Sequence, residues 1–511
     1  MNQTSIFDAL YPKYKITKPI RLIEFFGGYG SQALALKYLG VEFEHWKLVE
    51  WAVKSIQAYK DIHFSCENFN YSNTMTKEQL INQLYNLGIS SNYNEPMTKQ
   101  QIERLSEQQL RTIWNNIVTT HNLVNIQQVK GKDLEIVDTD KYDYILTYSF
   151  PCQDLSLAGK GKGMSDTSTR SGMLWEVERI LTECYELGSL PQILLMENVP
   201  QVHGVDNLKD FNKWQLRLEE LGYKNYMQDL IATDYGIPQT RNRCFMVSIL
   251  GDYSYQFPKP IPLKLKLKNM LEDNVDEKYY LSDKIQEKIL SVYEGNKNSV
   301  GIDLCDSQSK SRDLCSTIKS RYNCGFEHFS PEPTGILIKN ATKKGYLEAT
   351  DGDGIDISSR MEHHRGTVQK EKAQTLTTQC DRGVVVDTLK KDLCNKLIQD
   401  GLVEEGDVVK HSYTQQILDG NKKCVEKNDG NMITLTTRGN CVGTTVKDEI
   451  GNLRIRKLTP KECFRLMGVK DEDYERCAKN QSDSSLYHLA GDSIVVNVLM
   501  AIFKELIEDV K

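Results

Sequence analysis

The stretch Arg21-Leu-Ile-Glu-Phe-Phe-Gly-Gly-Tyr-Gly-Ser31 joins a largely apolar run to a glycine-rich turn near the start of the chain. A helical pattern over 32–39 follows directly, so the segment predicts a strand that passes through the turn into a helix. Glycines in such a turn let the backbone approach a ligand closely at the positive end of the helix. The segment therefore predicts an α/β fold that begins with a ligand-binding loop.

The same alternation of apolar runs and helical patterns continues through the first half of the chain. It predicts a doubly wound, mostly parallel α/β sheet. In such sheets ligands bind outside the carboxyl ends of the strands, so reactive residues are expected just after each apolar run. The expected strands are 21–26, 43–50, 142–150, 192–196 and 243–250, and the expected helices are 32–39, 52–59 and 172–187.

The glycine-rich turn also carries a cofactor signal. Gly28-x-Gly30-x-x-Ala33 fits the loose dinucleotide fingerprint, and Glu50 lies twenty residues past Gly30, where such folds place an acid that binds ribose. Trp51 could stack on an adenine ring. The motif leaves open a choice between a nicotinamide and another adenosine-bearing cofactor.

The composition is that of an ordinary globular chain. Of 511 residues 39% are hydrophobic, and 64 Lys+Arg against 70 Asp+Glu give a net charge of −6, so an anionic partner must be bound by a local basic groove. The chain has no run of about 18 apolar residues, and its first residues do not form a secretory signal. The thirteen cysteines are scattered without a Cys-x-x-Cys pair. We therefore expect a cytoplasmic protein without a metal site or a membrane span.

Three changes of pattern suggest the domain boundaries. Polar, helix-favouring sequence over about 61–130 indicates a helical insertion, in which Thr76 and Thr98 could each cap a helix. The prolines of 258–262 mark a hinge, and short β-like pieces follow to about residue 453. An apolar stripe over 494–507 then predicts a helix that packs back on the first domain. The expected domains are 1–262, 263–453 and 454–511.

Cys152 is the candidate nucleophile. A cysteine inside an ordinary strand would be an inert core residue. Cys152 instead follows Pro151 just beyond the strand expected at 142–150, and a Gly/Lys-rich loop over 158–163 comes next. Such open, electropositive surroundings make a thiolate usable.

Two further segments supply an acid and two arginines. Glu197 and Asn198 follow the apolar run 192–196, so the Glu197 carboxyl should be partly desolvated, which favours its neutral form. Arg241 and Arg243 are two residues apart, share one face of an extended segment and could hold a phosphate or polarise a base carbonyl.

A thiolate, a protonatable acid, an arginine and an adenosine-type cofactor together suit one chemistry. Addition of a thiolate to C6 of a pyrimidine lets C5 attack an electrophilic methyl group, provided that N3 is protonated or hydrogen-bonded. Hydride transfer would need no such cysteine.

In these residues the chain resembles the DNA (cytosine-5)-methyltransferases of bacteria and phages. The family's Phe-x-Gly-x-Gly loop matches Phe26, Gly28 and Gly30, and its Pro-Cys-Gln signature begins at Pro151. Ser31 and Asp492 depart from the family's usual Gly and Asn. The other matches are Glu50 with Trp51, Asp133 with Leu134, Glu197-Asn198-Val199, Gln239-x-Arg241-x-Arg243, 456–468 and 491–498.

The resemblance implies an S-adenosylmethionine-dependent methyltransferase fold with an inserted, smaller β-rich target-recognition domain. It implies that a cytosine flipped out of a specific double-stranded DNA sequence is methylated through a covalent bond between Cys152 and C6, with a mobile loop over about 153–170. The implied catalytic residues are Cys152, Glu197, Asn198, Arg241 and Arg243. The implied cofactor-binding residues are Phe26, Gly28, Gly30, Glu50, Trp51, Asp133, Leu134, Pro151, Leu174, Asp492 and Ser493.

The resemblance also implies a monomer that needs no metal and works in the bacterial cytoplasm, either beside a separate restriction endonuclease or as a solitary or phage enzyme. Candidates for DNA contacts are Arg321, Arg360, Arg365, Arg382 and Arg438. Methylation of transfer RNA by the same machinery and a catalytically inactive DNA-binding relative are the main alternatives. The roughly 200 residues of the recognition segment favour reading of a duplex groove.

Overall fold

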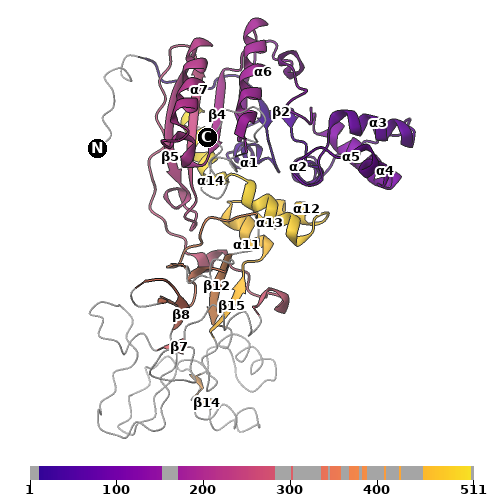
Figure 1. Cartoon of the computed structure of the whole chain (residues 1–511). Coiled ribbons are helices and arrows are strands. Elements are labelled where there is room, and N and C mark those ends of the chain that lie inside the picture. The colour runs from indigo at the N-terminus through magenta and orange to yellow at the C-terminus, as the bar shows by residue number, and fades with distance from the viewer. Residues whose placement is uncertain are drawn as a thin grey trace. The chain divides into compact units, whose positions relative to one another are not determined.

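The computed structural model describes residues 11–151, 171–281, 301–302, 335–342, 346–357, 367–378, 382–387, 408–409, 425–426 and 453–507. The chain forms two compact units, which Figure 1 draws without fixing their relative positions. The first unit comprises Met1–Leu265, Thr375–Cys380 and Pro460–Lys511, and the second comprises Lys266–Gln374 and Asp381–Thr459.

A six-stranded sheet in the order β2-β1-β3-β4-β6-β5 organises the first unit. The first four strands run parallel, and β6 is antiparallel to both β4 and β5. The predicted doubly wound, mostly parallel sheet is thus confirmed. The strands are β1 (Ile20–Phe25), β2 (Phe43–Val49), β3 (Asp143–Tyr148), β4 (Ile193–Asn198), β5 (Tyr223–Ile231) and β6 (Asn242–Leu250).

Helices cover both faces of this sheet. Ile23, Leu146 and Leu194 belong to the main core cluster together with side chains of α6 and α7, while the intervening Leu22 and Ile145 are buried as well. Successive residues of a strand point to opposite faces, so neither face meets water. The helices are α1 (Ser31–Tyr38), α2 (Val53–His63), α6 (Leu174–Glu186) and α7 (Leu208–Glu220).

The expected helical insertion forms a small lobe with its own core (Figure 1). The predicted caps are confirmed, since the Thr76 and Thr98 hydroxyls each accept a hydrogen bond from the backbone N–H of the glutamine three residues later. The side-chain oxygen of that glutamine in turn accepts from the backbone N–H of the threonine. Ser106 caps a third helix in the same way. The helices are α3 (Lys77–Leu87), α4 (Lys99–Glu103) and α5 (Glu107–Thr119).

The chain returns to the first unit through four helices at its end. The predicted apolar helix is α14, which packs against α1. The stretch Asp483–Leu506 is long and apolar enough to cross a membrane by composition, yet 67% of its apolar 18-residue window is buried within the protein, as in a core helix. The helices are α11 (Pro460–Leu466), α12 (Asp471–Ala478), α13 (Asp483–Asp492) and α14 (Val496–Leu506).

The second unit is built from antiparallel strands around a small core that includes Ile338, Ile355 and Val385. Its larger sheet has the order β11-β10-β12-β15, and a second sheet has the order β7-β8-β9. The strands are β7 (Gly301–Ile302), β8 (Gly335–Lys339), β9 (Tyr346–Ala349), β10 (Gly354–Asp356), β11 (Val368–Gln369), β12 (Arg382–Asp387), β13 (Val408–Val409), β14 (Val425–Glu426) and β15 (Leu453–Lys457).

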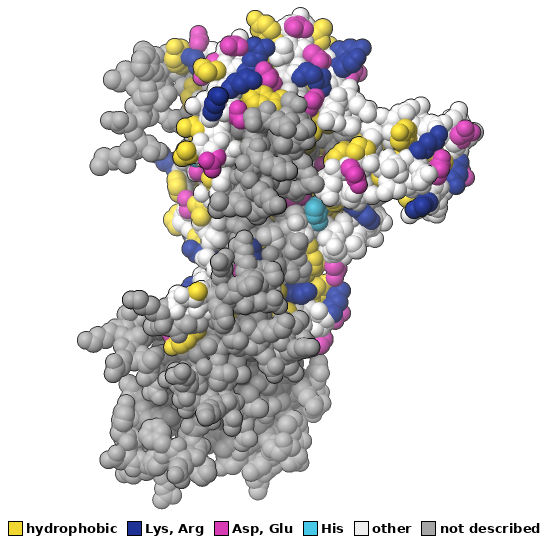
Figure 2. Space-filling view, viewed as in Figure 1, with side chains coloured by type: hydrophobic (Ala, Val, Ile, Leu, Met, Phe, Trp, Pro, Cys, Tyr) yellow, Lys and Arg dark blue, Asp and Glu magenta, His cyan; other side chains and the backbone are white. Residues whose placement is uncertain are grey.

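The surface charge of the first unit agrees with the small net charge of the sequence, because neither sign dominates (Figure 2). On the face of the first unit drawn in Figure 2, basic and acidic side chains are interspersed. Arg382, a candidate for DNA contact, forms a 3.1 Å ion pair with Asp356 inside the second unit. The other four candidate arginines, Arg321, Arg360, Arg365 and Arg438, lie outside the described residues.

Candidate functional site

A pocket of about 420 Å³ opens at the carboxyl ends of β1 to β4, where the sheet topology predicted it. All of its lining residues belong to the first unit. Its wall brings together segments that are far apart in the chain. These include Phe26–Gly28, Val49–Trp51, Tyr93–Pro96, Val124–Gln127, Ser149–Pro151, Glu197–Val199, Arg241, Arg243, His488 and Gly491–Ile494.

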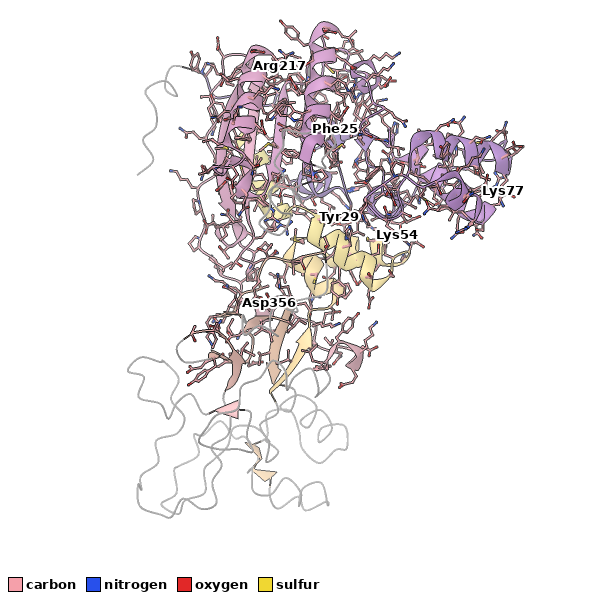
Figure 3. All side chains as sticks on the ribbon, viewed as in Figure 1. Phe25, Tyr29, Lys54, Lys77, Arg217 and Asp356 are labelled. Atoms are coloured by element: carbon pink, nitrogen blue, oxygen red, sulfur yellow. The ribbon has the colours of Figure 1, made fainter. Side chains whose placement is uncertain are left out.

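The glycine-rich turn is shaped by close packing beneath it. Gly30 has a φ of +83° and precedes the first residue of α1, and a side chain there would meet the rings of His63 and Tyr59, the latter at 2.7 Å. Phe26 also has a positive φ of 57°, which is a strained conformation for a residue with a side chain. Tyr29, labelled in Figure 3, ties the turn to the C-terminal segment by donating to Ser493 Oγ at 2.8 Å.

Glu50 lies just past the end of β2 and supports the turn from the side. Its carboxylate accepts hydrogen bonds from the backbone N–H groups of Gly28 at 3.0 Å and Ala52 at 2.8 Å. Only 9% of the residue is exposed, and this burial raises the pKa of Glu50 to about 7. The neighbouring Trp51 lines the pocket and packs against the core of the helical insertion.

Glu197 and Arg243, which also line the pocket, form an ion pair. The antiparallel pairing of β4 with β6 sets Glu197 opposite Phe245, so Arg243 is its diagonal neighbour, and Arg243 Nε lies 3.1 Å from Glu197 Oε1. Glu197 is only 7% exposed, so desolvation raises its pKa, although Arg243 and Arg241 oppose the shift. A raised pKa favours the protonated, hydrogen-donating carboxyl that the sequence led us to expect.

Asn198 and Arg241 hold the backbone around this pair. The Asn198 amide donates to Phe150 O at 3.0 Å. Arg241 is 4% exposed and donates to the carbonyl oxygens of Leu376, Gly491 and Ser493. These three carbonyls engage the Arg241 guanidinium, and the expectation that it also meets a phosphate or base stays a prediction.

The C-terminal segment closes the remaining side of the pocket. Asp492 and Ser493 both line it, as expected. Asp492 Oδ2 lies 3.2 Å from His488 Nε2, and about half of the Asp492 side chain is exposed.

Three expected cofactor contacts are not part of the pocket wall. Asp133 caps a short 3-10 helix (Gly131–Leu134), and Leu134 and Leu174 are side chains of the main core. Val124–Gln127 lines the pocket in place of Asp133 and Leu134, because this segment follows a bridge that pairs Asn122 with Leu48 of β2. Met173 lines it beside Leu174.

Cys152 lies outside the described residues, as does the expected mobile loop 153–170. Pro151, immediately before it, lines the pocket together with Ser149 and Phe150. The described chain therefore reaches the pocket one residue before the candidate nucleophile.

Besides Val124–Gln127, sequence reasoning missed a second segment of the pocket wall. Tyr93–Pro96, a loop of the helical insertion, faces the same space as Glu50 and Asp492. The turn Tyr93-Asn-Glu-Pro96 contains no glycine and matches no recognised binding motif, so the sequence gave no signal that it would reach the pocket.

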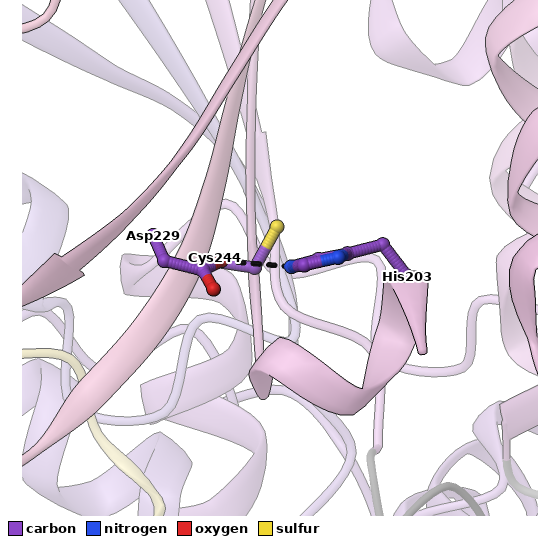
Figure 4. A group of neighbouring side chains, drawn as sticks. All are labelled: His203, Asp229 and Cys244. Atoms are coloured by element: carbon purple, nitrogen blue, oxygen red, sulfur yellow. Dashed lines mark hydrogen bonds and ion pairs between the residues drawn. The ribbon is translucent and has the colours of Figure 1, made fainter. Parts of the chain in front are cut away.

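One group among the described residues could hold a metal ion. The donor atoms of His203, Asp229 and Cys244 all lie within 4.8 Å of one another, and His203 Nε2 is 2.9 Å from Asp229 Oδ1 (Figure 4). Burial and the adjacent Asp229 and Glu197 carboxylates raise the pKa of the Cys244 thiol. A protonated thiol is a poor metal ligand, and the Asp229 carboxylate is already hydrogen-bonded to His203, so both observations argue against a metal at this group. That the enzyme needs no metal stays a prediction.

Comparison with known proteins gives one consistent result. A family model described as C-5 cytosine-specific DNA methylase matches residues 85–508. The orphan methyltransferase M.SssI of Spiroplasma monobiae is 33% identical over 344 residues, which are 66% of this chain and 84% of that protein. The type II methyltransferase M2.ScrFI of Lactococcus lactis subsp. cremoris is 28% identical over 490 residues, 95% of this chain and 99% of its own. The crystal structure of the S. pombe Dnmt2 methyltransferase covers 95% of this chain at 14% identity with a TM-score of 0.47, too distant a likeness to bear on mechanism.

Proposed function

Because this chain belongs to the family of C-5 cytosine-specific DNA methylases and transfers a methyl group from S-adenosylmethionine to C5 of cytosine in DNA, we propose which of its residues do so. Cys152 is the nucleophile, Glu197 is the acid that holds N3, and Arg243 positions Glu197. The observation that carries this proposal is the buried Glu197–Arg243 pair, which faces a pocket that also holds Pro151.

The pocket suits S-adenosylmethionine by its size and its donor set. Phe26 and Trp51 offer aromatic faces, Gly28 offers backbone close to α1, and Glu50 offers carboxylate oxygens for ribose hydroxyls. Asn125, Ile126, Asp492 and Ser493 complete the proposed set. When bound, this donor supplies an electrophilic methyl group carried on a sulfonium.

The protein residues then make the cytosine reactive. The base has to leave the duplex, because C5 and C6 cannot be reached inside the stack. The Cys152 thiolate bonds to C6, the electrons of the C5–C6 double bond move to C5, and Glu197 gives its proton to N3. After C5 is methylated, a base takes the C5 proton, the C5–C6 double bond re-forms as the thiolate leaves C6, and N3 returns its proton to Glu197. Burial of Glu197 assists the proton transfer to N3 because it favours the protonated carboxyl.

We further propose that the target-recognition domain expected over 263–453, most of which belongs to the second unit, reads a specific double-stranded DNA sequence. Its length of roughly 200 residues supports this role, because it is large enough to read a duplex groove. The protein acts as a monomer in the bacterial cytoplasm, and any partner restriction endonuclease is a separate protein. Light scattering during gel filtration tests the monomer, and bisulfite sequencing of DNA from expressing cells reports the recognised sequence.

Two measurements test the covalent route. The Cys152→Ala variant should bind duplex DNA normally and transfer no methyl group. Duplex DNA with 5-fluorocytosine at the target should trap an adduct on the Cys152 peptide that survives denaturant, because the C5 proton is replaced and cannot be removed. An active Cys152→Ala protein, or an adduct on another residue, would refute the assignment. Incubation with transfer RNA in parallel separates the RNA alternative.

A further inference from the structure

The loop Ser90–Pro96 joins α3 to α4 in the helical insertion, yet four of its residues, Tyr93 to Pro96, line the pocket of the catalytic unit. The helical insertion therefore contributes part of the pocket wall. Its loop faces the space where Glu50 and Asp492 are placed to meet the polar part of the donor.

Hydrogen bonds hold this loop in one conformation. Ser90 Oγ donates to Glu95 O at 2.8 Å and accepts from Tyr93 N at 3.1 Å. Asn92 Oδ1 accepts from the backbone N–H groups of Asn94 and Glu95 at 3.0 and 3.2 Å. Tyr93 itself has a φ of 64°, a strained conformation that persists only where surrounding contacts determine it.

The loop is also tied to the segment that carries Glu50. Ser90 N donates to Trp51 O at 2.8 Å, and Val53 N donates to Ser90 O at 2.9 Å. Trp51 directly follows Glu50, so the loop and the acid form one backbone-bonded piece. A displacement of the insertion would move both.

Tyr93 closes the pocket against the C-terminal helices. Its ring lies 3.9 Å from the ring of His488, centroid to centroid, and His488 pairs with Asp492. The Tyr93 hydroxyl is buried beside Ser55, near Glu50 and Asp492, and has no hydrogen bond of ordinary geometry to another described residue. A buried hydroxyl without a partner is costly, and a polar ligand in the pocket would relieve that cost.

We propose that the helical insertion supplies the outer wall of the methyl-donor pocket and that the Tyr93 hydroxyl hydrogen-bonds the ribose or methionyl part of the donor. Tyr93 is thus a positioning residue for the donor, and the insertion tunes donor affinity. This inference rests on the proposed location of S-adenosylmethionine in the pocket.

Calorimetric titration of the full chain with S-adenosylhomocysteine, the demethylated product, tests the proposal without turnover. Tyr93→Phe removes only the hydroxyl and should raise the Kd about three- to tenfold, as expected for one neutral hydrogen bond. Tyr93→Ala removes the wall and should raise the Kd further. Affinity for duplex DNA without donor should stay the same for both variants.

Tyr85 provides the matched control. It lies on α3 of the same insertion, is about half exposed and does not line the pocket, so Tyr85→Phe should leave the Kd unchanged. Glu50→Gln separates the two hypotheses. If Glu50→Gln weakens binding and Tyr93→Phe does not, the role of Tyr93 is refuted alone. If neither changes the Kd, the donor does not bind in this pocket, and both hypotheses fail.

Discussion

Two buried carboxylates face the same pocket from the ends of two parallel strands, and their partners differ. Glu50, after β2, accepts two backbone N–H groups, whereas Glu197, at the end of β4, pairs with the Arg243 guanidinium. Burial raises the pKa of both. Backbone donors leave a carboxylate as an acceptor of further hydroxyl groups, while an arginine holds an acid in place beside a base.

The comparison shows that burial alone does not assign a role to an acid. The same desolvation would serve donor binding at Glu50 and proton donation at Glu197 in the proposed mechanism. We infer that the hydrogen-bond partners of each carboxylate decide between donor binding and proton donation, and substitution of each acid tests this difference.

The largest effect is expected for Glu197→Gln. An amide can hydrogen-bond N3 but cannot give it a proton, so kcat for methyl transfer should fall by about 10²–10⁴-fold. The Kd for S-adenosylhomocysteine should change by less than about twofold, since a proton at N3 is not needed for donor binding. Single-turnover transfer of a labelled methyl group, with calorimetry alongside, measures both.

Glu178→Gln is the matched control for this change. Glu178 also pairs with an arginine, Arg217, at 3.4 Å, but on α6 and α7 away from the pocket; Figure 3 labels Arg217. Its replacement should leave kcat near the native value. A Glu197→Gln enzyme with native kcat would show that Glu197 is a structural acid like Glu178.

A smaller effect, on binding rather than on turnover, is expected at Glu50. The ionised carboxylate is the better hydrogen-bond acceptor, and its pKa is about 7. The Kd for S-adenosylhomocysteine should therefore rise about tenfold as the pH falls from 8 to 6, and this dependence should disappear in Glu50→Gln. Calorimetry at pH 6, 7 and 8 measures it.

The stability of the free protein should follow the opposite trend. Because folding raises the pKa of Glu50 from 4.5 to about 7, its contribution is present below pH 4.5 and is lost as the pH rises through 7. Glu44→Gln, an exposed change on β2, is the control for both trends. A pH-independent Kd in the native protein would contradict the role of Glu50.

The smallest effect is expected from metal removal. Exhaustive dialysis against a chelator should change the rate of methyl transfer by less than about twofold, because the donors of His203, Asp229 and Cys244 are already hydrogen-bonded or protonated. Elemental analysis of the purified protein checks the result. One equivalent of zinc, lost together with activity, would overturn the prediction.

The sequence predicted most of the sheet, and it supplied the candidates for the reacting residues, which stay predictions. Strands β1, β3 and β4 are buried on both faces, so each reads as a continuous apolar run that needs no tertiary knowledge. Strand β5 was missed because it lies at the edge of the sheet, where polar and apolar residues mix. Glu197 became a candidate because a carboxylate that follows such a buried run is unusual.

Long-range pairing decided the rest. The ion pair of Glu197 with Arg243 exists because β6 turns antiparallel and enters the sheet next to β4, an arrangement that no local pattern encodes. Tertiary contacts also decide the surroundings of Arg241, which donates hydrogen bonds to three carbonyl groups that are distant in the chain. They likewise decide that Tyr93 of the helical insertion lines the pocket. Local chemistry and periodicity are written in short stretches of sequence, whereas a pocket wall depends on which segments the whole chain brings together.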